Sequence, residues 1–120
     1  MKNLFAILSI TLSLFFSNCV QKTFTKTVVY TLRLDSTQEI TSVGIRGNDK
    51  PLDWNTDYEL KEIQKGVLYQ AVVTYHTGYK FTEAKFTVNG EFELQNDPNR
   101  RIAFSDSDTS YYEATFNSVK

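Results

Sequence analysis

The chain has 120 residues, of which 41% are hydrophobic and 14% aromatic, as expected for one ordinary globular domain. It carries 13 lysines and arginines against 14 aspartates and glutamates, so it has no excess of basic charge with which to neutralise nucleic-acid phosphates. This length leaves little room for a second domain, and a nucleic-acid-binding protein is disfavoured.

The N-terminal residues have the pattern of an export signal. Lys2 precedes an uninterrupted apolar or hydroxylated run over residues 4–16, which is the length of the hydrophobic part of a signal peptide. As a helix this run would span about 20 Å, less than the ~30 Å hydrocarbon core of a bilayer. We therefore predict a signal peptide over residues 1–18 rather than a transmembrane helix.

Cys19, the only cysteine of the chain, directly follows this run and has no second thiol with which to form a disulfide. Together with the preceding Phe16-Ser17-Asn18 it resembles a bacterial lipobox, in which the cysteine is acylated. The resemblance implies a lipid anchor at Cys19, a short tether over residues 19–26, and export to the cell envelope, on the periplasmic or surface face of the outer membrane. Ordinary secretion with cleavage near Cys19 is the alternative.

Beyond the tether, hydrophobic residues recur at every second position, which is the pattern of half-buried β-strands. Strands are expected over residues 27–34, 43–45, 59–63, 67–75, 83–88, 92–94, 101–104 and 111–116. Gly66 and the pair Asn89-Gly90 supply hairpin turns between them. About eight short strands without a helical stripe predict an all-β fold, an antiparallel sandwich or barrel over residues 27–120.

Two neighbouring tyrosines are constrained by this alternation. Tyr111 and Tyr112 are adjacent in the last strand, so at most one of them faces solvent.

The chain is poor in residues suited to catalysis. His76 is its only histidine and is expected in a solvated loop rather than as a metal ligand or base. Glu91 and Glu93 lie two residues apart on one strand face, so we interpret them as a solvated or rim pair rather than as glycosidase acids.

Asp106 and Asp108 lie in a serine-rich segment that is expected to be an exposed loop, with Ca²⁺ binding as the less favoured alternative. Phosphate-binding and nucleophile motifs are also missing from the sequence. We expect no enzyme activity, no cofactor and no metal site.

Several short motifs, each weak alone, occur in a characteristic order. They are VGIR at 43–46, PLDW at 51–54, Leu60, YQAVV at 69–73, EAKF at 83–86, FE at 92–93 and DPNR at 97–100. This order resembles the starch-binding domain family, carbohydrate-binding module family 20, and the related glycogen-binding modules. It also resembles small modules in exported proteins of Bacteroidetes-type bacteria. The resemblance implies an immunoglobulin-like antiparallel β-sandwich of seven to eight strands that binds α-glucans without catalysis.

Carried over by motif, the family's sugar-binding residues correspond to Trp54, Lys85, Phe92 and Asn99 in this chain. Tyr69 matches the family's strand aromatic that fills the core, so the resemblance implies a core position for it rather than a sugar contact. Aromatic faces pack against the apolar faces of glucose rings, while lysine and asparagine donate hydrogen bonds to the hydroxyl groups. Counting back from DPNR without a gap would place Leu94, instead of Phe92, at the second aromatic position. The resemblance therefore leaves both assignments open.

Each of the four residues also has an ordinary structural interpretation. Trp54 could fill the core, Phe92 could pack inward from its strand, Lys85 could be a solvated lysine, and Asn99 could hold a turn. Only their grouping on one exposed face would favour binding over these separate roles.

The leading hypothesis is a carbohydrate-binding lipoprotein domain, with an α-glucan as its ligand, the membrane as its attachment and a glycoside hydrolase or transporter as its neighbour. The alternative is a protein-interaction module with the same sandwich and a degenerate sugar site. An exposed apolar patch around Trp54 would serve that second role.

Overall fold

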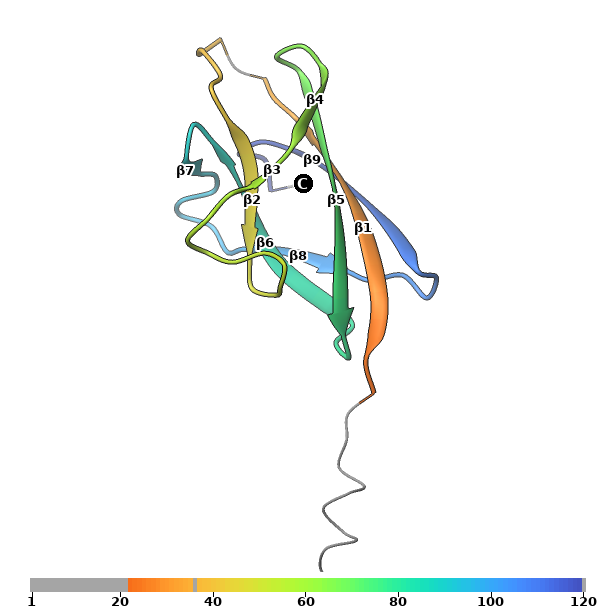
Figure 1. Cartoon of the computed structure of the whole chain (residues 1–120). Coiled ribbons are helices and arrows are strands. Elements are labelled where there is room, and N and C mark those ends of the chain that lie inside the picture. The colour runs from red at the N-terminus through yellow and green to blue at the C-terminus, as the bar shows by residue number, and fades with distance from the viewer. Residues whose placement is uncertain (1–21, 36, 120) are drawn as a thin grey trace, which may run out of the picture.

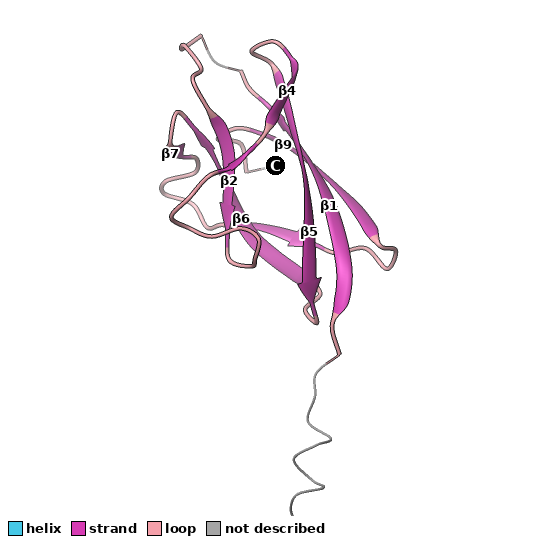
Figure 2. Ribbon diagram, in the orientation of Figure 1, coloured by secondary structure: helices cyan, strands magenta, loops and turns pink. Residues whose placement is uncertain are grey.

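The computed structural model describes residues 22–35 and 37–119. The predicted signal peptide, the proposed anchor Cys19 and the first part of the tether lie outside the described residues. Throughout the described ranges the chain forms β-strands, turns and loops (Figure 2), and no helix there is long and apolar enough to span a bilayer. The all-β prediction is confirmed.

The nine described strands form two sheets that face each other (Figure 1). One sheet has the order β4 (Lys61–Gln64), β5 (Leu68–Thr77), β1 (Phe24–Arg33) and β9 (Thr109–Thr115). The other has the order β3 (Tyr58–Glu59), β2 (Val43–Gly47), β6 (Phe81–Val88) and β7 (Glu91–Phe92), and β8 (Arg100–Ala103) pairs with the start of β6. All pairs are antiparallel except β1 and β9, which run parallel.

The strand count exceeds the predicted seven to eight because one expected strand is divided. Residues 59–63 were expected to form a single strand, but Leu60 breaks them into β3, in one sheet, and β4, in the other. The Leu60 side chain is buried and its N–H donates to the Val43 carbonyl at 2.9 Å. Leu60 is thus the point at which the chain crosses between the sheets.

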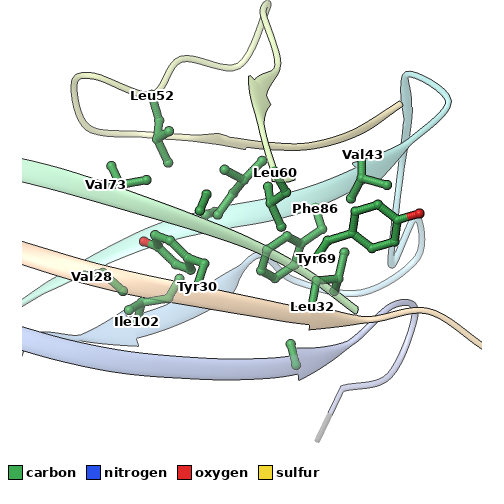
Figure 3. Packing of buried hydrophobic residues seen from close by; sticks show 14 of the residues in the cluster. Val28, Tyr30, Leu32, Val43, Leu52, Leu60, Tyr69, Val73, Phe86 and Ile102 are labelled. Atoms are coloured by element: carbon green, nitrogen blue, oxygen red, sulfur yellow. The ribbon is translucent and has the colours of Figure 1, made fainter. Parts of the chain in front are cut away.

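The core lies between the sheets and follows the period-two pattern of the sequence (Figure 3). Alternate residues of β1 and β5 are buried, including Tyr69, as predicted. At the centre the Tyr30 and Tyr75 hydroxyls are 2.7 Å apart, and the Tyr30 ring meets Phe86 edge to face at 6.1 Å. This hydrogen bond satisfies both hydroxyls away from water.

The Asn89-Gly90 hairpin is confirmed. Both residues have positive φ, 53° and 79°, as the two central positions of a tight β-hairpin require. The Asn89 side chain also accepts a 2.7 Å hydrogen bond from the N–H of Thr41, which ties the turn to the segment before β2.

Other single-residue predictions can be compared directly with the structure. Tyr111 is 78% exposed while Tyr112 packs against the Tyr30 ring, so the two point to opposite sides as expected. His76 was expected in a loop, and this prediction is wrong: it lies in β5, where it pairs with Thr25 of β1 because the strand extends two residues further than predicted. Its side chain is exposed.

The serine-rich loop between β8 and β9 is exposed and is held by a lysine. Lys26 Nζ donates to the carbonyls of Ser105, Asp106 and Ser107 at 3.0, 3.4 and 3.1 Å. Within the described ranges no three His, Cys, Asp or Glu residues come together in a way that could hold a metal ion.

Candidate functional site

Residues from four separate segments of the chain line one shallow depression on the outer side of the β2–β6 sheet. The depression has a volume of about 470 Å³ and is lined by Trp54, Lys85, Phe92, Gln95 and Asn99. Trp54 belongs to the loop after β2, Lys85 to β6, Phe92 to β7, and Asn99 to the loop before β8. The structure therefore brings together all four residues that the sequence singled out for one site.

Trp54 and Phe92 form the aromatic part of the depression. Their ring centroids are 6.2 Å apart and the ring planes are inclined by 54°. Both side chains are half-buried, so neither is a core plug and each keeps surface open to solvent.

Leu94, the alternative second aromatic position, does not contribute to this surface. It is only 6% exposed, and its φ of 49° turns the backbone away from β7. Its N–H donates to Asn117 Oδ1 at 2.9 Å. The aromatic that stands beside Trp54 is therefore Phe92.

Local contacts hold the loop that carries Trp54. Leu52 is 2% exposed and anchors the loop in the core. Asp53 Oδ1 accepts hydrogen bonds from the N–H groups of Asn55 and Thr56, both at 2.8 Å, which bends the chain into a turn around Trp54. Figure 1 shows this loop on the same side of the molecule as β7.

Arg46 supports the aromatic pair and was not recognised from the sequence. Its Nε donates to Asp57 Oδ1 at 2.7 Å, and its Nη1 donates to the Trp54 carbonyl at 3.4 Å. Its guanidinium carbon lies 5.0 Å from the centroid of the Phe92 ring. The only signal in the sequence is alternation, which places Arg46 on the outer face of its strand, opposite to Ile45.

A glycine makes room for the acid that holds Arg46. A Cβ atom built on Gly44 would lie 2.7 Å from the Asp57 side chain and 2.9 Å from Thr87 Oγ1, which are contacts too short for a real side chain. Thr87 Oγ1 in turn donates to Asp57 Oδ1 at 2.8 Å. Thr87 is fully buried at this contact.

Lys85 lines the depression and also holds a neighbouring loop. Its Nζ donates to the carbonyls of Leu94 and Asp97 at 2.7 and 3.0 Å, so it holds the loop between β7 and β8. An ammonium group has three protons, so these two carbonyls leave one of them unused. Lys85 is therefore more constrained than the solvated lysine that its strand position alone would suggest.

The interpretation of Glu91 and Glu93 as a solvated pair is wrong. Glu91 is exposed, but Glu93 is fully buried and forms a two-pronged ion pair with Arg100, Nε–Oε2 2.7 Å and Nη2–Oε1 2.8 Å. The two glutamates differ in burial because β7 ends at Phe92. Glu93 lies outside the strand, so it need not share a face with Glu91.

Glu93 and Arg100 join the site loop to its surroundings. Glu93 Oε2 also accepts from the Phe86 N–H at 2.8 Å, and Arg100 Nη2 donates to the carbonyls of Thr115 and Ser118 at 3.0 and 2.7 Å. Burial opposes the charge of Arg100, but hydrogen bonding and charge attraction, led by Glu93, outweigh burial and raise the pKa of Arg100. The loop that carries Gln95 and Asn99 is thus fixed at both ends.

The five side chains that line the depression offer two aromatic rings, one lysine and two amides. These groups can pack against an apolar ring face and exchange hydrogen bonds with hydroxyl groups. No protein-family model and no curated protein matches this chain. What the depression binds is therefore inferred from its chemistry and from the motif resemblance.

Proposed function

We propose that this chain is a non-catalytic carbohydrate-binding domain of a membrane-anchored lipoprotein, and that its ligand is an α-glucan of the starch or glycogen type. The observation that carries the proposal is the grouping of Trp54, Lys85, Phe92 and Asn99 around one exposed depression. The order of motifs along the sequence points to the same four residues.

The angle between the aromatic rings supports an α-glucan over a flat polysaccharide. Consecutive glucose units in an α-1,4-linked chain turn relative to one another, so the chain is curved. Two rings that line one depression and are inclined by 54° can contact sugar units that turn relative to one another, whereas coplanar rings would suit an extended ribbon.

The depression is shallow and open, so each contact with sugar is expected to be weak. A polysaccharide presents many identical sites, and several anchored copies of the domain could engage one chain at once. This multivalency suits a protein that retains a polymer at the cell envelope for a neighbouring glycoside hydrolase or transporter.

Affinity electrophoresis of the Cys19→Ser chain in native gels that contain glycogen tests the proposal. We expect the Cys19→Ser chain to be retarded by glycogen. Adding Trp54→Ala should weaken glycogen binding about tenfold or more, because the indole supplies much of the apolar contact. Tyr111→Ala removes a more exposed aromatic, from the other sheet, and should migrate as the parent does. Absence of retardation, or equal losses in both variants, would contradict the proposal.

A second function, binding of a protein partner, is supported by a separate groove of about 520 Å³ between β3, β4 and β5. Ile63 and Val72 line it and are 57% and 54% exposed. If the chain is not retarded by any glucan, this groove together with the Trp54 surface becomes the better candidate for its function.

A further inference from the structure

Three exposed aromatic residues lie at the end of the sandwich where the chain enters β1. Phe24 is 58% exposed, Tyr79 65% and Phe81 36%. Phe24 pairs with Thr77 at the end of β5, and the Tyr79 N–H donates to Thr77 Oγ1 at 3.0 Å. Figure 1 shows the turn between β5 and β6 beside the start of β1. We name this surface, formed by Phe24, Tyr79 and Phe81, the aromatic end.

Basic residues accompany the aromatic end. Lys22 and Lys80 are exposed, and the Arg101 guanidinium lies 3.6 Å from the centroid of the Phe81 ring. Residues 76–82 include no carboxylate. Tyrosine and phenylalanine flanked by lysine and arginine are the residues that settle at the boundary between lipid headgroups and acyl chains.

The length of the chain before β1 indicates what covers this surface. Four residues separate Cys19 from Phe24, so even in a fully extended chain these two residues are at most about 18 Å apart. Since β1 begins at Phe24, inside the region predicted as tether, a lipid on Cys19 would hold the aromatic end against the bilayer.

We propose that the aromatic end is a membrane-contact surface, with Phe24, Tyr79 and Phe81 in the headgroup region and Lys22 and Lys80 beside anionic headgroups. This inference rests on the lipid anchor at Cys19 that forms part of the proposed function. Each basic residue near an anionic surface adds to the attraction, so a second contact supplements the acyl chains.

This orientation places the sugar-binding depression away from the membrane. Phe81 begins β6, whereas Phe92 pairs with Thr87 six residues further along the same strand. At about 3.3 Å per residue, Phe92 lies on the order of 20 Å from the aromatic end, and Lys85, at the near side of the depression, lies about 13 Å from it. A polysaccharide chain could then reach Trp54 from the side without approaching the lipid.

The test uses the single tryptophan of the chain as an internal control. The acylated full chain is purified from bacterial membranes and reconstituted in vesicles of brominated phosphatidylcholine and phosphatidylglycerol, whose bromine atoms quench nearby indoles. Two variants in a Trp54→Phe background, Tyr79→Trp and Tyr111→Trp, place one indole at the aromatic end or on the exposed face of β9.

We expect Tyr79→Trp to be quenched about twofold more strongly than Tyr111→Trp or native Trp54, because only the aromatic end reaches the depth of the acyl boundary. Equal quenching of the three indoles in a chain that remains in the membrane fraction would overturn this inference and leave the anchor intact. If the parent chain and its Cys19→Ser variant are equally absent from membranes, the proposal of a lipid anchor is wrong, and the proposal of a membrane-contact surface is wrong with it. Glycogen binding by the soluble Cys19→Ser chain is unaffected by either outcome.

Discussion

At the scale of single residues, the paired hydroxyls of Tyr30 and Tyr75 make the stability of the fold depend on pH. Both side chains are at most 1% exposed, and their only polar atoms meet at 2.7 Å. Burial raises the pKa of Tyr75 to about 12. Burial, reinforced by the neighbouring Tyr75, raises the pKa of Tyr30 as well.

These shifts predict a loss of stability at alkaline pH. Tyrosines of the unfolded chain release their protons near pH 10, while the folded chain retains them, so the unfolded state binds fewer protons. The free energy of unfolding should be constant up to about pH 10 and then fall by up to about 1.4 kcal/mol per pH unit for each tyrosine, through the Tyr75 pKa of about 12. Urea denaturation at a series of pH values measures this.

Two variants show which tyrosines are responsible. Tyr75→Phe should lower stability by about 1–3 kcal/mol at neutral pH, because the Tyr30 hydroxyl loses its partner, and should make the alkaline decline shallower. Tyr111→Phe, at a 78% exposed position, should reproduce the wild-type profile. A wild-type stability that stays flat between pH 10 and 12 would refute this assignment.

Residue roles could be predicted only where a motif named them. Trp54, Lys85 and Asn99 were selected by motif, and the structure places them around one depression. Arg46 was missed because its role depends on Asp57, eleven positions away, and on the Phe92 ring. A single outward arginine in a strand carries no signal of that contact, which arises only when β2, β6 and β7 are laid side by side.

At the scale of elements, the loop between β7 and β8 is shaped by a buried charge pair. Glu93 begins this loop and Arg100, the first residue of β8, follows it. Their side chains bond each other, β6, the end of β9 and the chain after β9. Removing one partner of a buried ion pair leaves an uncompensated charge and costs about 3–5 kcal/mol, a large part of the 5–15 kcal/mol available to a small domain.

We predict that Glu93→Gln lowers the free energy of unfolding by about 3 kcal/mol, measured by urea denaturation at pH 7. Glu91→Gln is a matched control, since it makes the same chemical change two positions away at an exposed site, and it should alter stability by at most about 0.5 kcal/mol. Equal effects of the two substitutions would show that the Glu93–Arg100 pair does not hold the loop.

The elements themselves could be predicted as far as local periodicity reaches. Alternation located the main strands and identified their buried faces, because each strand must present one side to the core. It could not reveal that Leu60 divides one strand between two sheets, nor that β7 ends before Glu93. Both features depend on hydrogen bonds to distant strands, such as the bond from the Leu60 N–H to the Val43 carbonyl.

At the scale of the whole molecule, the sandwich separates two surfaces. The depression with Trp54 and Phe92 lies beside β7, at one end of β6, and the aromatic end with Phe81 lies at the other. The all-β character could be anticipated from the alternation and the turn spacing, and the two-sheet sandwich from the motif resemblance. The separation of the two surfaces could not, because it is set by the register between β6 and its neighbours.

The most direct test of carbohydrate binding is an NMR titration of the Cys19→Ser chain with maltoheptaose. We predict that the largest shift changes occur at the Trp54 indole N–H and at the side-chain amides of Gln95 and Asn99, which line the depression. Resonances of Ile63 and Val72 in the second groove should stay in place. Unchanged Trp54, Gln95 and Asn99 resonances at millimolar maltoheptaose, or changes confined to the second groove, would contradict the assignment of this depression as a glucan-binding site.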